Sequence, residues 1–265
     1  TWTNCPGCNA NSVGQYIHSC LLLLEKEKGY DLSKTTVGLV GVGHVGHAVI
    51  EAIRPLGVQI LLNDPPQKEA LRKAGKPHEF FLKMEELQEK CDIISFHTTL
   101  ITKGPYPTFH LANKTFFNAL KKQPIIINTS RGAVVDNTDV LQALKDGIIR
   151  DAIIDTWENE PNINQELLNL IYIGTPHIAG YSADGKANAT RMALTALCNH
   201  FHLPVTFQIR VPQLPEEELP APNLTETERA LVLYNPHADS LKLKSHPTMF
   251  EELRGNYPLR REFIE

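Results

Sequence analysis

The sequence predicts an α/β protein built on a doubly wound parallel sheet. Six short apolar segments are rich in β-branched residues and lack polar alternation, as expected of strands that are buried on both faces. Segments with helical character separate these strands, and that alternation requires right-handed crossover connections. A glycine-rich turn follows the first strand and opens the next helix, which is a third sign of this fold class.

The elements follow in a regular order. An amphipathic helix comes first, because apolar residues recur at helical spacing between Val13 and Leu24. The predicted strands then lie at 36–41, 58–64, 92–97, 124–130, 151–157 and 170–177. Helices are predicted near 44–56, 82–90, 113–122, 137–146 and 163–169, and a longer amphipathic helix from about Asp184 to His202.

The character of the sequence changes after this long helix. Residues 203–224 carry five prolines and an acidic cluster. Proline fixes φ and removes a backbone donor, so this segment is predicted to be an extended connector. The residues after this connector are expected to form a small α+β appendage with one strand at 229–234 and one or two helices. This appendage is too small to fold alone.

Bulk composition argues against several classes of function. The net charge is −4 and no long basic run is present, so nucleic acid is not an expected partner. No apolar segment reaches the roughly 20 residues that a membrane helix needs. The five cysteines are an odd number, which argues against a disulfide framework. No secretory signal is visible in this chain, which begins at Thr1, and we expect a cytoplasmic protein.

Two cysteines form the motif CPGC near the start of the chain. Cys5, Cys8, His18 and Cys20 offer thiolate and imidazole ligands for zinc, and CxxC is also the spacing of a redox dithiol. Cys20, however, lies on the apolar stripe of the first helix, where a small buried side chain is the simpler interpretation. No βαβ pattern precedes the pair, so we expect neither a metal nor a dithiol site here.

The glycine-rich turn has the form GxGxxG, with Gly41, Gly43 and Gly46 at the glycine positions. The first glycine permits the tight turn, the second lets backbone amides approach a pyrophosphate, and the third lets helix and strand pack closely. The helix start at His44 and Val45 offers unpaired N–H groups and a partial positive charge. This context predicts a Rossmann dinucleotide-binding domain.

The second strand ends at Asp64, about 20 residues beyond the glycine turn. A carboxylate there accepts hydrogen bonds from the hydroxyls of the adenosine ribose and repels a 2′-phosphate, so NAD is favoured over NADP. His44 and His47 also form an HxxH pair on one helix face. A metal there would need further ligands and would compete with the phosphate, so no metal site is expected.

Three polar residues, Arg131, Glu160 and His177, each come just after a predicted strand. Because the carboxyl ends of parallel strands converge on one crevice, we expect the three to meet there. Histidine suits reversible proton transfer near neutral pH, and a neighbouring carboxylate would orient its ring. Arginine offers a planar, permanently charged fork for a substrate carboxylate. The group predicts oxidation of a secondary alcohol.

These segments together resemble the D-2-hydroxyacid dehydrogenase family. The likeness is carried by GVGHVG, FHTTL, NTSRGAVVD, DTWENEP and HIAGY, and spans about residues 5–190, with weaker similarity at LPAP and LRGNYPLRREF. Four segments favour a branch of the family that oxidises a small phosphorylated 2-hydroxy acid, namely PGCNA, NDPPQ, FHTTLITKGPYPTFHLA and HIAGYSADGKA. The resemblance implies that His177 is the base in oxidation and the acid in reverse, with Arg131 and Glu160 completing the catalytic group.

The resemblance also implies roles for other residues. Asp64 would bind the adenosine ribose, Thr98 and Asp155 would line the nicotinamide side, Gly180 would approach the cofactor, and Tyr181 would contact the substrate.

The family's substrate domain is discontinuous, and CPGCNANSVGQYI looks like the crossing from it into the nucleotide domain. An N-terminal substrate lobe is then expected upstream, with the phosphate-binding residues in it. The resemblance implies an NAD-binding domain with flanking linker helices over 1–203, and a proline-rich connector with a dimerisation region over 204–265. A homodimer is expected.

Two alternatives stay open. The same chemistry could act on phosphoglycerate or hydroxypyruvate/glyoxylate, which a substrate panel ranked by kcat/KM would decide. The chain could instead be a non-catalytic NAD(H)-sensing module, which the fold alone permits. The intact catalytic group argues against a sensor, because sensing does not need a base and an arginine.

Overall fold

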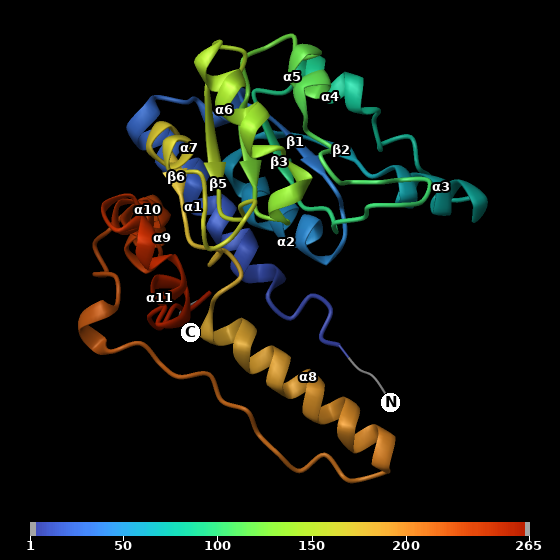
Figure 1. The fold of residues 1–265 in the computed structure, drawn as a ribbon. Coiled ribbons are helices and arrows are strands. Elements are labelled where there is room, and N and C mark those ends of the chain that lie inside the picture. The colour runs from blue at the N-terminus through green and yellow to red at the C-terminus, as the bar shows by residue number, and fades with distance from the viewer. Residues whose placement is uncertain (1–3, 263–265) are drawn as a thin grey trace.

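A six-stranded sheet organises the structure, a computed structural model that describes residues 4–262 (Figure 1). The strands are β1 (Thr36–Val40), β2 (Gln59–Asn63), β3 (Ile93–Phe96), β4 (Ile125–Asn128), β5 (Asp151–Ile154) and β6 (Ile173–Gly174). Their spatial order is β2-β1-β3-β4-β5-β6, and every neighbouring pair is parallel. Each strand lies within a predicted segment, and the predicted doubly wound α/β class is confirmed.

Helices cover both faces of the sheet, which explains why its strands are apolar throughout. Successive side chains of a strand point to opposite faces, so Ile125 and Ile127 join one apolar cluster and Ile126 joins the other. The first cluster includes α1 (Ala10–Lys28) and α2 (His44–Ile53). The second includes α4 (Met84–Lys90), α5 (Lys114–Asn118), α6 (Asn137–Lys145) and α7 (Gln165–Leu170).

The predicted apolar stripe of α1 is confirmed. Cys20 is fully buried on that stripe, and burial raises the pKa of its thiol well above the usual range. A thiol held in its neutral form in an apolar core is a poor metal ligand, because metals bind the thiolate. Within residues 4–262, no group of three or more His, Cys, Asp or Glu side chains is arranged to hold a metal ion.

A helix between β2 and α4 is absent from the predicted elements. This helix, α3 (Pro65–Lys73), begins at two consecutive prolines. Proline is acceptable at the first helical position because its missing N–H would have no helical partner. Asp64 caps the helix by accepting from the backbone N–H of Gln67 at 2.9 Å.

The expected strand at 229–234 is wrong, because these residues belong mostly to α9 (Glu226–Leu233). Thr225 and Glu228 form a capping box that starts the helix, and this local signal outweighs the apolar, strand-like run of the segment. Two more helices follow, α10 (Pro236–Ser245) and α11 (Phe250–Gly255). The described part of the C-terminal region, residues 204–262, holds no strand, so it is α-helical and not α+β.

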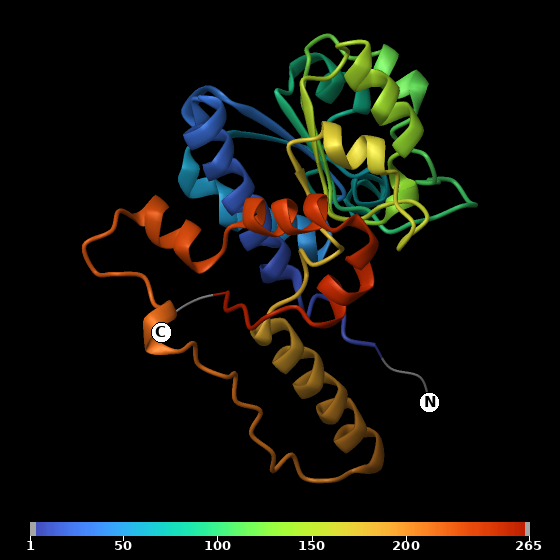
Figure 2. The ribbon, with the colours of Figure 1, turned by 60° about the vertical axis from the view of Figure 1, so that its left-hand side comes forward.

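The long helix α8 (Ala183–Phe201) confirms the predicted helix and projects away from the sheet (Figures 1 and 2). An extended connector then returns beside it to the helices α9–α11, which pack near α1 and β6. Leu243 and Phe250 from this region are fully buried. The division of the chain at residue 203 stays a prediction.

Short 3₁₀ helices complete the description, at Leu32–Lys34, Arg54–Leu56, Gly132–Val134, Glu216–Glu218 and Pro247–Met249. None of the helices in residues 4–262 combines the length and apolarity required to cross a membrane.

Candidate active site

A groove of about 860 Å³ lies at the carboxyl ends of β1, β2 and β3. The chain passes from β1 outward to β2 and then returns to β3 on the other side of β1, so strand order reverses here. Ligands of doubly wound sheets bind at such a reversal. Four of the predicted cofactor residues line the groove, namely Gly41, Gly43, Asp64 and Thr98.

The glycine turn has the shape that a bound pyrophosphate requires. Gly41 has φ +91°, and a Cβ there would lie 2.9 Å from the carbonyl of His97. A Cβ on Gly46 would collide with the Gly41 carbonyl oxygen. A Cβ on Gly43 would meet nothing within 4 Å, so the space beside the start of α2 is open. Two glycines thus permit close packing, and the third borders the open space in front of the helix N-terminus.

Asp64 joins the glycine turn to the start of α3. Its Oδ2 accepts from the backbone N–H of Val42 at 2.8 Å, and its Oδ1 accepts from that of Gln67. These two bonds fix the carboxylate at the edge of the groove, the position predicted for the adenosine ribose.

Thr98 carries a polar atom that has no partner. Its Oγ1 is buried and makes no hydrogen bond to any described residue, although Thr98 lines the groove. A buried hydroxyl without a partner is unfavourable by about 1–3 kcal/mol. The open space at Gly43 and this unpaired hydroxyl both fit a polar dinucleotide lying along the groove.

His177 and Glu160 form a direct pair at the ends of β6 and β5. The imidazole Nδ1 lies 2.8 Å from Glu160 Oε2, and Glu160 Oε1 accepts from the backbone N–H of Trp157 at 2.8 Å. The carboxylate is therefore fixed on one oxygen while it orients the ring with the other. Because Nδ1 is engaged, Nε2 is the ring atom available for proton exchange with a substrate.

Asp155 anchors the turn that carries His177. Its backbone carbonyl accepts from the His177 N–H at 2.9 Å. Its carboxylate accepts from the N–H groups of Ile178 and Ala179 at 2.8 and 3.0 Å. It also accepts from the Thr175 hydroxyl at 2.7 Å. Burial raises the pKa of this carboxyl, and the neighbouring His177 and these hydrogen bonds oppose the rise. Its predicted place at the nicotinamide stays a prediction.

Arg131 lies on the turn after β4, which packs against the turn after β5. The Asn128 side-chain amide donates to the carbonyls of Arg131 and Thr156, at 3.1 and 3.3 Å. A Cβ on Gly132 would overlap the carbonyl oxygen of Trp157, so the two backbones are in close contact. The Arg131 side chain is exposed and donates to the Ser130 carbonyl at 2.6 Å. The structure therefore joins Glu160 and His177 directly and places the Arg131 turn beside them through backbone contacts.

The other predicted residues lie around this centre. A Cβ on Gly7 would lie 2.8 Å from the imidazole of His44, so this ring packs against the CPGC turn, and Val45 packs against the core. Their groups available to a cofactor are therefore the backbone amides at the start of α2.

Gly180 and Tyr181 face the ends of the described chain. A Cβ on Gly180 would collide with the Asn9 side chain, which donates to the Gly180 carbonyl at 3.4 Å. The Tyr181 ring meets the Tyr257 ring edge-on, with centroids 6.3 Å apart. Their roles at cofactor and substrate stay predictions.

Two histidines near the site were missed from the sequence. His97 lines the groove, contacts Ser95 Oγ at 2.9 Å, and has a pKa lowered to about 3 by burial. His110 lies between Glu158 and Asp136, at 2.7 and 3.1 Å. The position of the FHTT stretch directly after a strand could have indicated His97, whereas His110 lies in a loop without such a signal.

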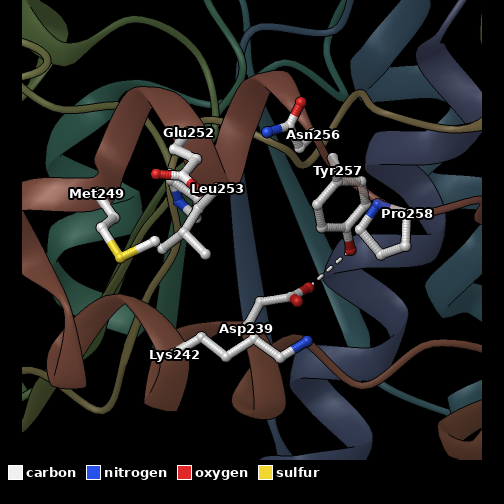
Figure 3. Close-up of a pocket in the computed structure, with 9 residues that line it drawn as sticks. Asp239, Lys242, Met249, Glu252, Leu253, Asn256, Tyr257 and Pro258 are labelled. Atoms are coloured by element: carbon white, nitrogen blue, oxygen red, sulfur yellow. Dashed lines mark hydrogen bonds between the residues drawn. The ribbon is translucent and has the colours of Figure 1, made fainter.

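A smaller cavity of about 210 Å³ lies beside Pro176, the residue before His177, and is lined mainly by the C-terminal helices (Figure 3). Within it the Tyr257 hydroxyl donates to Asp239 at 2.7 Å, and burial raises the pKa of the Asp239 carboxyl. The C-terminal region thus borders the histidine turn on the side of this cavity.

A groove at a glycine-rich turn and a histidine–carboxylate pair, both at the carboxyl edge of one doubly wound sheet, are features of NAD-dependent dehydrogenases. Residues 21–179 match the family described as D-isomer specific 2-hydroxyacid dehydrogenase, NAD binding domain, and the chain belongs to this family. The predicted resemblance, the predicted cofactor NAD and the predicted dehydrogenase class are confirmed.

Curated relatives narrow the assignment to one branch. The chain is 51% identical to the erythronate-4-phosphate dehydrogenase of Bacteroides fragilis, over 99% of this chain and 73% of that protein. It is 41% identical to the erythronate-4-phosphate dehydrogenase of Porphyromonas gingivalis, over 98% of this chain and 71% of that protein.

Among solved structures, the NAD complex of the NAD-dependent formate dehydrogenase from Staphylococcus aureus is similar, with a TM-score of 0.61 and 23% identity. The match covers 77% of this chain and 65% of that one, and it shows the shared fold.

Proposed function

We propose that this protein oxidises 4-phospho-D-erythronate to 2-oxo-3-hydroxy-4-phosphobutanoate with NAD, in pyridoxal phosphate (vitamin B6) biosynthesis. The observation that carries the proposal is the 2.8 Å contact between His177 Nδ1 and Glu160, at the same sheet edge as the glycine turn. The erythronate-4-phosphate dehydrogenases among the relatives support the choice of substrate.

The catalytic work falls to three side chains. Nε2 of His177 takes the proton of the substrate C2 hydroxyl during oxidation and returns it in the reverse direction. Glu160 holds the ring through Nδ1, which leaves Nε2 for the substrate. Arg131 binds the substrate carboxylate and polarises the C2 oxygen, as its fork of donors permits. NAD supplies the hydride acceptor when bound.

The cofactor occupies the groove of the glycine turn. Gly41, Gly43 and Gly46 and the backbone amides of His44 and Val45 hold the pyrophosphate.

The other cofactor contacts come from four side chains or turns. Asp64 binds the adenosine ribose, and the Thr98 hydroxyl gains its missing partner from the cofactor. Asp155 and Gly180 border the nicotinamide side through the turn that carries His177.

The substrate and the assembly complete the proposal. Tyr181, four residues after His177, contacts the phosphorylated substrate. The protein acts in the cytoplasm as a homodimer, and exposed apolar side chains on and after α8, namely Leu197, Phe201, Leu203 and Val205, are consistent with a protein contact there. Sedimentation of the purified protein tests the oligomeric state.

The decisive experiment follows NADH absorbance. The protein is expressed with the residues that flank this sequence in its gene, and is given NAD with 4-phosphoerythronate, phosphoglycerate or, in reverse with NADH, hydroxypyruvate. We expect the highest kcat/KM with 4-phosphoerythronate and its loss in His177→Ala. Turnover that prefers another acid would identify a different substrate. NADH binding without any turnover, equal in wild type and variant, would favour an NAD(H) sensor.

A further inference from the structure

Three consecutive charged residues close the described chain, and all three are buried. Arg260, Arg261 and Glu262 are 4%, 5% and 6% exposed. Charged side chains are almost never this buried unless they are paired. We call residues 260–262 the C-terminal clamp, because their partners lie in segments far away in sequence.

The guanidinium of Arg260 binds the turn that carries the catalytic histidine. Its Nη2 donates to the Ala179 carbonyl at 2.7 Å, and its Nη1 donates to the Ile178 carbonyl at 3.3 Å. Nη2 also donates to the carbonyl of Ser12 in α1 at 3.3 Å. The guanidinium carbon lies over the Tyr234 ring, 4.1 Å from its centroid. Three carbonyls and an aromatic face therefore surround the charge, while the buried Nε has no hydrogen-bond partner among the described residues.

The two peptide units after His177 are held from both sides. The N–H groups of Ile178 and Ala179 donate to the Asp155 carboxylate, and their carbonyls accept from Arg260. His177 itself has φ +57°, a left-handed conformation that a residue with a side chain adopts only when its surroundings enforce it. Asp155, at the end of β5, restrains the turn through the N–H groups of residues 178 and 179. Arg260, in the C-terminal segment, restrains it through their carbonyls.

The other two residues of the C-terminal clamp have their side-chain partners away from the histidine turn. Glu262 Oε1 accepts from the hydroxyls of Ser12 and Ser182 at 2.6 and 2.7 Å. Arg261 pairs with Asp184, near the start of α8, at 3.0 Å. Both residues therefore bind the starts of α1 and α8, and Arg260 alone of the three donates to the carbonyls of residues 178 and 179.

We propose that Arg260 is a positioning residue for His177, so that the C-terminal segment belongs to the catalytic apparatus without contacting the reacting atoms. The inference rests on the proposed function, in which His177 moves the proton. A displacement of about 1 Å in a catalytic group can lower the rate about 100-fold. The planar fork of arginine binds two adjacent carbonyls at once, whereas the single ammonium of lysine cannot hold both in the same geometry.

Kinetics of Arg260 variants test the proposal, with Arg261→Ala as the matched control. We expect Arg260→Ala to lower kcat by about 30-fold or more while the KM for NAD changes less than about twofold, because Arg260 does not line the groove at the glycine turn, where most of the proposed cofactor contacts lie. Arg260→Lys should recover part of the rate, and millimolar guanidinium added to Arg260→Ala should restore part of it. Arg261→Ala should keep kcat within about threefold. Equal losses in both alanine variants, or none in Arg260→Ala, would overturn the proposal.

Hydrogen exchange separates this proposal from the proposed function. In Arg260→Ala the amides of Ile178 and Ala179 should exchange about 10-fold faster, whereas in Arg261→Ala they should not change. If the wild-type protein shows no turnover but the two amides still exchange faster in Arg260→Ala than in Arg261→Ala, the proposed function is disproved and the restraint on the turn is retained. An active wild type whose Arg260 variants leave these amides unchanged disproves the positioning role. Arg260→Lys gives the same measurement if the alanine variant does not fold.

Discussion

The backbone N–H of His177 donates to the carbonyl oxygen of Asp155 over 2.9 Å. Asp155 directly follows β5, and the Thr175 N–H likewise donates to Ile154 in β5, so the chain after β6 stays aligned with the sheet as far as the histidine. The position of the proposed base is thus fixed by backbone contacts to β5 and its end. Its ring orientation is fixed separately, by Glu160.

Glu160→Gln should therefore impair proton transfer without affecting the cofactor. The amide retains the size of the carboxylate but not its charge, so its contact with Nδ1 is weaker and holds the ring less firmly. We expect kcat to fall about 10- to 100-fold and the dissociation constant for NAD to change less than about twofold. Stopped-flow NADH formation and calorimetric NAD binding measure the two quantities. A matching loss of NAD affinity would show that Glu160 serves the groove instead.

Thr98→Val should separate cofactor binding from stability. The buried Thr98 hydroxyl has no partner in the described residues, so removing it breaks no internal hydrogen bond. We expect the free energy of unfolding to stay the same or rise by about 1 kcal/mol, while NAD affinity falls about 3- to 10-fold.

Thr156→Val is the matched control, because Thr156 Oγ1 is likewise buried without a described partner but does not line the groove. It should leave NAD affinity unchanged. Equal NAD affinities in the two variants would show that Thr98 does not contact the cofactor.

Gly132→Ala should disturb the contact between the Arg131 turn and the Glu160 turn. The added methyl would overlap the Trp157 carbonyl oxygen, so the backbones must separate. We expect destabilisation of about 1–3 kcal/mol and a lower kcat/KM, because Arg131 moves with the turn. Gly255→Ala serves as control, since a Cβ there meets nothing within 4 Å. Urea unfolding and steady-state kinetics measure both effects, and a fully active Gly132→Ala would contradict the importance of the contact.

His97 should make the protein less stable in acid. Its pKa is lowered to about 3 by burial, whereas in the unfolded chain it is about 6.5. Above pH 6.5 the imidazole is neutral in both states and has no effect. As the pH falls from about 6.5 towards 3, only the unfolded chain takes up this proton, so stability decreases by up to about 1.4 kcal/mol per pH unit.

His97→Gln should flatten that dependence. Urea unfolding between pH 8 and pH 4.5 would show a shallower loss of stability in the variant, after correction for its baseline at pH 8. Parallel curves for wild type and variant would show that His97 does not titrate in this way.

Much of the sheet was predictable because both of its faces are covered. Burial on both sides makes a strand such as Ile125–Asn128 continuously apolar, which distinguishes it from helices with one apolar face. The helices that begin at Pro65 and Glu226 were missed because the main sequence signal for each is its N-terminal cap. Two prolines follow the first cap, and an apolar, strand-like run follows the second.

The candidate site was predictable only in part, for a different reason. Glu160 and His177 could be predicted to meet because each follows a strand of one parallel sheet. The restraint by Arg260 could not, since it depends on how a segment after a proline-rich connector folds back onto residues 178–179. The anchoring role of Asp155 likewise requires backbone geometry that a residue pattern does not contain.

The hydrogen bond between Ser12 and Glu262 joins residues that the ribosome adds at very different times. Among the described residues, every partner of the C-terminal clamp precedes it in sequence, so the nascent chain completes its sheet and glycine turn before Arg260 is synthesised. A growing chain can therefore acquire a nucleotide pocket well before its histidine turn is held from both sides.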